Sequence, residues 1–293
     1  MRWQGGRRSS NVEDRRGAGL GRPLAVGGGA ASLVVALLVM LLGGDPSVVT
    51  TPSGGRGPSS DYGTGGSGEP DDPRQAELKD FVSVILADTE DTWPGLLEPH
   101  GVEYVDPRLV LFTGAVRSAC GFQQSAVGPF YCPPDQRVYL DLDFFDELDR
   151  RFGAPGDFAQ AYVVAHEVGH HVQNLLGISR QVQAARQRAS PEDGNALSVL
   201  QELQADCFAG IWAHHAQRER QILEAGDVEE GLGAASAIGD DTLQRRAQGH
   251  VVPESFTHGS SAQRVEWFKR GLTQGTLEAC DTFGAQSVPR RRR

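Results

Sequence analysis

Two histidines and a glutamate form the first chemically suggestive pattern in the sequence. The segment His166-Glu-Val-Gly-His170 is an HExxH motif within a stretch whose apolar residues predict a helix. Residues i and i+4 lie on one face of a helix, so both imidazoles can reach one metal ion. Glu167 is then placed to take a proton from a water molecule on that ion. The pattern is typical of zinc-dependent peptidases, and we expect one catalytic Zn²⁺.

A catalytic zinc needs a third protein ligand and an open position for water. Glu202 and Asp206 follow in the next long predicted helix and share one of its faces. If that helix returns antiparallel, Glu202 completes a His₂Glu site, and Asp206 accepts a hydrogen bond from the distal N–H of a ligand histidine. The alternative is a solvated acidic face, which the apolar neighbours Leu203 and Phe208 disfavour.

Peptide hydrolysis also needs a donor for the oxyanion. His258, in a Gly/Ser loop, is the first candidate, although a surface histidine is the alternative reading, and Tyr139 is the second candidate. Arg264 either pairs with a carboxylate near the site or caps the last helix. His171 lies about 100° around the helix from His170, so we expect it to be structural.

Apolar periodicity predicts the elements that position these residues. Short strands are expected at 109–113, 130–132 and 137–141, before the active-site helix. The last of these is either a sheet edge that pairs with a peptide backbone or an ordinary strand. The predicted class is α+β, mainly helical, with a small sheet. Helices are expected at 75–91, 144–152, 157–177, 179–189, 196–217, 227–247 and 261–274.

The stretch Leu24–Leu42 is a run of 19 residues without a charge. It is about long enough to cross a bilayer of ~30 Å. Arginine-rich sequence precedes it, so the positive-inside rule places the N-terminus in the cytoplasm and the remainder outside. A cleaved signal peptide or a buried core helix are the alternatives. The expected organisation is a disordered basic cytoplasmic tail at 1–23, a single transmembrane helix at 24–42, a Gly/Pro/Ser-rich linker at 43–73, a catalytic domain at 74–285 and a basic tail at 286–293.

The amino-acid composition and charge indicate which classes of binding partner are unfavourable. Apolar residues make up 39% and charged residues 23% of the chain, as in ordinary globular proteins. The net charge is −10 although both ends are rich in arginine, so the region between them is strongly acidic. An acidic body disfavours nucleic acid as a partner. The Arg290–Arg293 tail is either a flexible charged terminus or a contact for anionic lipid or wall polymer.

Four cysteines are present, and none forms a CxxC pair. A location outside the cytoplasm permits disulfides. Cys120 and Cys132 flank a stretch that could fold back as a hairpin, and Cys207 with Cys280 would close a long loop. We therefore predict the pairs Cys120–Cys132 and Cys207–Cys280; four free buried thiols are the alternative.

Several motifs together resemble one known family. They are His166–His171, Glu202–Asp206, Phe256–Ser260 with Arg264, and Gly128–Asp135. These segments are similar to those of the neutral zinc metallopeptidases of YpfJ type, a bacterial membrane-anchored group that resembles the gluzincins. The resemblance covers about residues 74–285. It implies a zincin-like, mainly helical fold and an edge strand that binds peptide in extended form.

The sequence thus favours a membrane-anchored zinc endopeptidase that acts on a peptide or protein outside the cytoplasm. A non-catalytic scaffold with a structural zinc site is a second class, which Glu167 disfavours because such a site needs no base. A zinc amidase acting on cell-wall peptide is a third.

Overall fold

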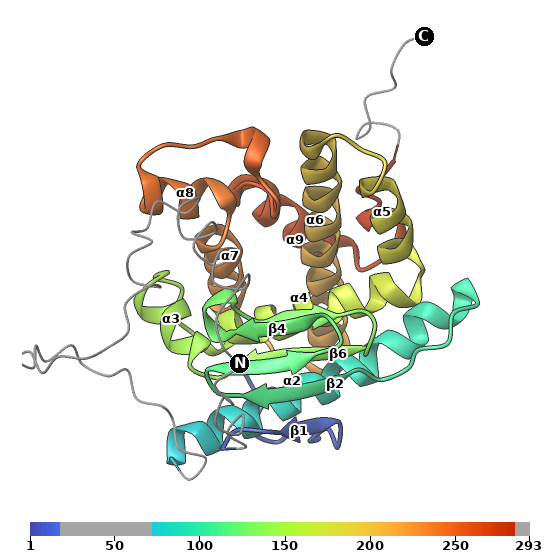
Figure 1. The fold of residues 1–293 in the computed structure, drawn as a ribbon. Coiled ribbons are helices and arrows are strands. Elements are labelled where there is room, and N and C mark those ends of the chain that lie inside the picture. The colour runs from blue at the N-terminus through green and yellow to red at the C-terminus, as the bar shows by residue number, and fades with distance from the viewer. Residues whose placement is uncertain (18–71, 285–293) are drawn as a thin grey trace, which may run out of the picture. The chain divides into compact units, whose positions relative to one another are not determined.

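The computed structural model describes residues 1–17 and 72–284 of the 293-residue chain. A small sheet lies against a larger group of helices (Figure 1), and the predicted mainly helical α+β class is confirmed. The apolar core lies between the sheet and the helices and continues among the helices themselves.

The main sheet has the strand order β1-β2-β6-β5. β1, β2 and β6 are parallel, and β5 runs antiparallel to β6. β6 lies between two neighbours, so residues 137–141 form an ordinary strand inside the sheet, which is the second of the two alternatives, and β5 is the edge strand on that side. The strand bounds are β1 (Val12–Asp14), β2 (Arg108–Phe112), β5 (Phe130–Cys132) and β6 (Arg137–Asp141).

A short hairpin, β3 (Ala115–Ser118) and β4 (Gly121–Gln124), precedes β5. Its turn carries Cys120, which is bonded to Cys132 on the edge strand. The second disulfide joins Cys207 to Cys280, so both predicted pairs are present.

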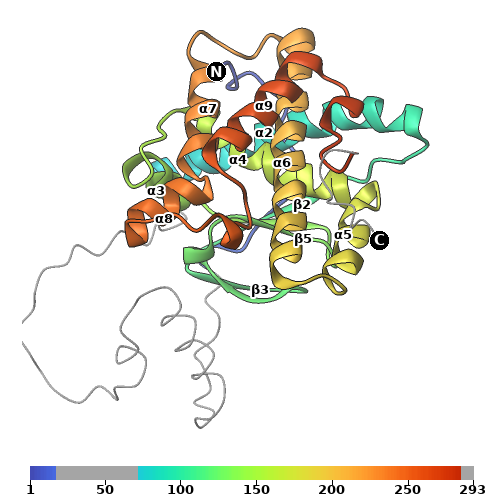
Figure 2. The same ribbon diagram turned by 90° about the horizontal axis from the view of Figure 1, so that it is seen from above.

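Helix α4 (Asp157–Leu175) carries the HExxH motif and packs against helices on several sides (Figures 1 and 2). Its principal neighbours are α2, α6 and α7. The predicted helix over 227–247 is two helices, because the chain turns at Gly239, where a side chain would collide with the backbone of Ser261. The remaining helix bounds are α2 (Pro73–Leu97), α3 (Phe144–Arg150), α5 (Ile178–Arg186), α6 (Pro191–His215), α7 (Asp227–Ala237), α8 (Asp240–Gln248) and α9 (Ser261–Gln274).

Helices α6 and α9 approach each other through two glycines. A Cβ atom on Gly210 would lie 2.2 Å from the carbonyl oxygen of Phe268, and one on Gly271 would lie 1.9 Å from that of Cys207. Both separations are far inside van der Waals contact, so only glycine permits this spacing. The approach brings Arg264 of α9 to the site described below.

Residues 1–17 are ordered and belong to the same body as residues 72–284. They run along α2 and add β1 to the sheet (Figure 1). The expectation of a disordered tail over 1–23 is therefore wrong for residues 1–17. Arginine-rich composition suggested a disordered segment, but two of these arginines, Arg7 and Arg8, pair with carboxylates of α2.

The expected transmembrane helix at 24–42 lies outside the described residues, as do the linker up to residue 71 and the tail at 286–293. Within residues 1–17 and 72–284, no helix has both the length and the apolar content needed to cross a bilayer.

Candidate metal centre

The HExxH segment lies where α4 crosses α6. Gly169, in the middle of the motif, allows the close approach, because a Cβ there would lie 2.9 Å from the carbonyl oxygen of Ala205. His166 and Glu167 are each only 7% exposed. The motif is therefore at the protein interior and faces the helix that carries the predicted third ligand.

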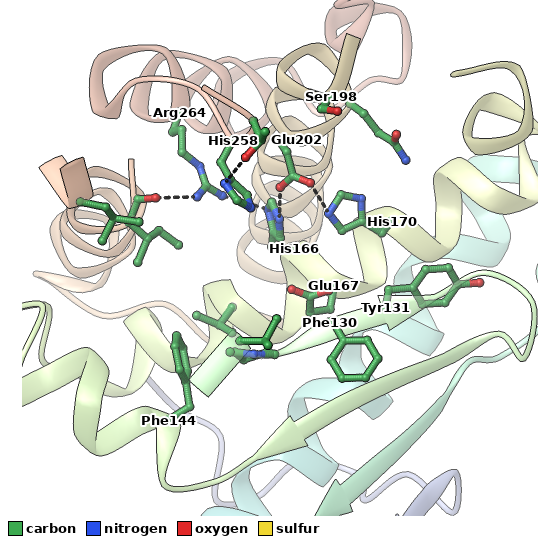
Figure 3. A pocket seen from close by; sticks show the side chains of 18 of the residues that line it. Phe130, Tyr131, Phe144, His166, Glu167, His170, Ser198, Glu202, His258 and Arg264 are labelled. Atoms are coloured by element: carbon green, nitrogen blue, oxygen red, sulfur yellow. Dashed lines mark hydrogen bonds and ion pairs between the residues drawn. The ribbon is translucent and has the colours of Figure 1, made fainter. Parts of the chain in front are cut away.

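Three donor groups converge on one point (Figure 3). The Nε2 atom of His166 lies 3.2 Å from Oε2 of Glu202, and that of His170 lies 3.3 Å from Oε1 of the same carboxylate. Ligands held ~2.1 Å from a tetrahedral zinc lie about 3.4 Å apart, so this spacing fits the ion. The two imidazoles and one carboxylate also match the donor set of a catalytic zinc.

His166 is oriented by Asp206. Its Nδ1 lies 2.8 Å from Oδ1 of Asp206, a carboxylate with no exposed surface. An ionised carboxylate can only accept, so Nδ1 carries the proton and Nε2 presents its lone pair to the metal position. The hydrogen bond that we predict for Asp206 is therefore made to His166.

Asp206 is compensated by a buried cation and a phenol. Arg264, 2% exposed, donates to its two oxygens through Nε and a terminal nitrogen, each at 2.8 Å. The Tyr162 hydroxyl also donates to Asp206. Burial alone would raise the pKa of Asp206, but Arg264 and His166 hold it at about 2. The carboxylate therefore stays ionised at neutral pH, and Arg264 adopts the first of its two predicted roles.

His170 is oriented differently, by a neutral amide that we did not predict. Gln173 donates from Nε2 to the carbonyl of Gln201 at 2.7 Å and to Oε1 of Gln204 at 3.1 Å. These two acceptors fix the amide so that Gln173 Oε1, 2.9 Å from Nδ1 of His170, must accept. The Nε2 lone pair of His170 is thereby directed at the metal position.

The hydrogen bonds that orient His170 extend from Gln173 through Gln204 to the second disulfide. Gln204 donates from Nε2 to the carbonyl oxygen of Cys280 at 3.0 Å, and Cys280 is bonded to Cys207, the neighbour of Asp206. The spacing of Gln173 three residues after His170 could have suggested its role. Gln204 could not have been recognised, because its partners come from distant parts of the chain.

The donor cluster opens into a cavity of about 700 Å³. Glu167 lies between the three donors and the β5 residues Phe130 and Tyr131 (Figure 3). Burial raises the pKa of Glu167 above its ordinary value. Beyond the donors, one part of the lining is apolar and includes Phe144, Phe152, Val163, Ile238 and Leu243.

His258 also lines this cavity, on the loop between α8 and α9. Its Nδ1 lies 3.1 Å from Oδ1 of Asp240, whose other oxygen accepts backbone N–H groups of Thr257, His258 and Gly259. The hydrogen bond to Asp240 raises the pKa of His258. Asp240 therefore favours the protonated form of this imidazole at the cavity wall.

The second oxyanion candidate does not reach the site. Tyr139 lies outside the cavity lining, and its hydroxyl donates to Asp135 at 2.7 Å. His171 points away from the donors, with Nδ1 2.9 Å from the Tyr131 hydroxyl and Nε2 2.6 Å from the Val105 carbonyl. Burial lowers the pKa of His171 to about 4, as suits a neutral structural histidine.

Comparison with known proteins agrees with this geometry. The sequence model of a family described as "Putative neutral zinc metallopeptidase" matches residues 1–283. The "Uncharacterized protein YpfJ" of Escherichia coli K12 is 49% identical over 293 residues, which cover 97% of this chain and 99% of that protein. The "Uncharacterized protein Rv2575" of Mycobacterium tuberculosis H37Rv is 42% identical over 223 residues, 73% of this chain and 74% of that one. No solved structure gives a significant match.

Proposed function

We propose that this chain, which belongs to the neutral zinc metallopeptidase family, is a zinc-dependent peptidase. The ligands of the zinc are His166, His170 and Glu202. The observation that carries the proposal is the convergence of these three donors, at zinc-compatible spacing, on the floor of an open cavity. A bound zinc would polarise the scissile carbonyl and lower the pKa of a water molecule beside Glu167.

Glu167 acts as the general base. A base works best when its pKa is near the working pH, and burial shifts the pKa of this carboxyl upward in that direction. Glu167 would take a proton from the attacking water and later deliver it to the leaving amine.

His258 stabilises the oxyanion of the tetrahedral intermediate. The hydrogen bond to Asp240 raises the pKa of this histidine and holds Nδ1 of its imidazole, so a protonated Nε2 can donate into the cavity. A pre-oriented donor of this kind is worth a factor of about 10²–10³ in turnover. Asp240 positions His258 and does not touch the substrate.

The substrate backbone pairs with β5. This strand is the sheet edge beside the metal position, and its residues Phe130 and Tyr131 line the cavity. An extended peptide can add to such an edge through main-chain hydrogen bonds. The apolar part of the lining, including Phe144 and Val163, favours a large apolar residue near the cleaved bond.

Location outside the cytoplasm is part of this proposal. Two disulfides account for all four cysteines, and such bonds persist in oxidising compartments. The single transmembrane helix expected at 24–42 is not part of this proposal, because one crossing would separate residues 1–17 from the domain against which they pack.

One experiment tests the proposal on the purified full-length chain. Zinc content and cleavage of casein, a quenched peptide library and cell-wall peptides are measured for the wild type and Glu167→Gln, with and without EDTA. We expect stoichiometric zinc in both proteins and peptide cleavage by the wild type alone. Zinc binding without any cleavage would support a non-catalytic scaffold instead, and cleavage of cell-wall peptide alone would support an amidase.

The ligand assignment has its own control. Glu202→Ala should lose most of its zinc affinity, because two imidazoles alone hold the ion poorly. An unchanged metal content in this variant would reject Glu202 as a ligand.

A further inference from the structure

The N-terminal arm, defined as residues 1–17, satisfies a buried charge of the peptidase domain. Glu90 on α2 is 7% exposed. Its side chain accepts from Arg7 at 3.0 Å, from Ser9 at 2.5 Å and from Asn11 at 2.8 Å. All three donors belong to the arm. Without the arm, Glu90 would lose these partners, and an uncompensated buried charge is strongly destabilising.

The arm is also joined to the domain by main-chain hydrogen bonds. β1 pairs in parallel with β2, and the amide of Leu109 donates to the carbonyl of Asn11 at 3.0 Å. The amide of Ser9 donates to the carbonyl of Ser83 at 3.0 Å. The arm therefore covers the edge of β2 that would otherwise expose unpaired backbone groups.

Apolar packing adds a third type of contact. Trp3 lies edge-on to Phe81, with ring centroids 5.2 Å apart. Gly6 lies so close to α2 that an added Cβ would be 2.5 Å from Cγ1 of Val84. Phe81 and Val84 are buried, and Trp3 and Gly6 are half-buried against them.

The arginines of the arm serve the same contact. Arg8 makes two hydrogen bonds to Asp80, at 2.8 and 2.6 Å, and Arg7 also pairs with Asp91. Arg16, 7% exposed, donates to Gln75 of α2 at 3.0 Å. Arg7, Arg8 and Arg16, three of the basic residues that suggest a cytoplasmic tail by the positive-inside rule, thus have structural partners on α2.

We infer that the N-terminal arm is a permanent part of its own chain's peptidase domain and lies on the same side of the membrane as that domain. A single crossing by residues 24–42 would place the two on opposite sides and abolish every contact described above. A cytoplasmic N-terminus joined to an external domain is incompatible with this packing. The inference does not depend on zinc or on peptidase activity.

A disulfide trap tests it in the full-length chain. A Cβ on Gly6 would lie 3.8 Å from Cβ of Val84, and disulfides span about 3.5–4.5 Å between these atoms. The double variant Gly6→Cys/Val84→Cys is produced in cells, and intact membranes are oxidised with the permeant reagent diamide. Peptide mapping without reduction then identifies the bonds. A Gly5→Cys/Val84→Cys variant is the matched control, because a Cβ on Gly5 meets nothing within 4 Å.

We expect a bond between positions 6 and 84 within one chain, together with both native disulfides, and little or none in the control. If both native disulfides form but the cysteine at position 6 remains a free thiol, the inference that the arm and the domain lie on the same side of the membrane is wrong. A covalent dimer would show that the arm docks on a second copy, and equal yields in test and control would show that the contact is non-specific; both overturn the inference.

A second measurement does not depend on new cysteines. A protease site is inserted after Gly66 of a chain with a C-terminal tag, and the chain is cut after extraction in mild detergent. The fragment that carries the arm should remain bound to the tagged domain. Its release from the wild-type chain contradicts docking, whereas release from Glu90→Arg alone agrees with it, because that change repels Arg7.

Discussion

At the scale of single residues, the two histidines of the candidate site are held by chemically different acceptors. Nδ1 of His166 meets an ionised carboxylate, Asp206, while Nδ1 of His170 meets the neutral amide of Gln173. Each acceptor fixes the tautomer that leaves Nε2 free for a metal. The carboxylate makes its imidazole the more basic ligand, and the amide supplies orientation with less charge.

This difference predicts an effect of Gln173→Ala. Loss of the acceptor frees the His170 ring to rotate and to change tautomer, so zinc affinity should fall about 10- to 100-fold. Competition with a chromophoric chelator measures it. Gln183→Ala, an exposed position on α5, is the control and should bind zinc like the wild type. Wild-type affinity in Gln173→Ala would contradict the orienting role.

A second residue-scale prediction concerns pH. Asp240 raises the pKa of His258, so the protonated imidazole persists above pH 6.5 and is lost as pH rises through the raised value. In Asp240→Asn the pKa of His258 should fall, and the alkaline limb of the kcat/KM profile should move to lower pH. The same ion pair stabilises the fold below pH 6.5 and ceases to do so above the raised pKa.

The pH profile of a quenched peptide substrate measures this shift. His258→Gln should lose the ionisation and lower kcat by about 10²–10³-fold. If the pH profile of kcat/KM is identical in Asp240→Asn and the wild type, His258 does not take part in catalysis.

The sequence identified the residues whose roles follow from spacing on one helix, and missed those fixed by tertiary contacts. His166 with His170, and Glu202 with Asp206, are i, i+4 pairs, so helix geometry alone aligns them. Gln204 acts through Cys280, and no local pattern encodes that contact. The position of Arg264 in the sequence allowed two roles, pairing with a carboxylate near the site or capping the last helix. Only the packing of α9 against α6 shows that it pairs with Asp206.

At the scale of elements, local signals determine how well each boundary was predicted. Helix α9 begins at the predicted residue because Ser260 and Gln263 form a capping box, and it ends as predicted because Gly275 adopts the left-handed conformation after its last turn. β1 was missed because three residues cannot show an alternating pattern, and the register that defines them comes from β2. Arg137–Asp141 was predicted as a strand, but its place inside the sheet also depends on the parallel pairing with β2, which lies far away in the sequence and which no local pattern specifies.

The contact between α6 and α9 gives a prediction at this scale. Gly271→Ala places a methyl group 1.9 Å from the carbonyl oxygen of Cys207, so the helices must separate. Overpacking of this kind costs about 1–3 kcal/mol. Because Arg264 moves with α9, Asp206 should also lose part of its compensation, and zinc affinity should fall.

Thermal and denaturant unfolding measure the change in stability. Gly233→Ala is the matched control: it lies within helix α7, and an added Cβ meets nothing within 4 Å. Alanine there should be neutral or stabilise by up to about 1 kcal/mol. Equal effects of the two substitutions would show that helix propensity, rather than helix contact, governs both.

At the scale of the whole molecule, the two disulfides stabilise different parts of the site. Cys120–Cys132 closes 12 residues and ties the hairpin to the edge strand that we propose binds substrate. Cys207–Cys280 closes 73 residues and fixes the C-terminal segment behind the metal ligands. One bond is therefore placed to support peptide binding, and the other to support the metal centre.

Removing each bond should consequently have distinct effects. In the chain-entropy model Cys207→Ser/Cys280→Ser costs about 4 kcal/mol, and Cys120→Ser/Cys132→Ser about 3 kcal/mol. The first double variant should also lose zinc affinity, because the Cys280 carbonyl no longer holds Gln204 and, through it, Gln173. The second should keep its zinc and show a raised KM, since β5 is released. Denaturant unfolding, chelator competition and peptide kinetics measure the three quantities. Equal zinc affinities in the two variants would disprove the connection between the second disulfide and His170.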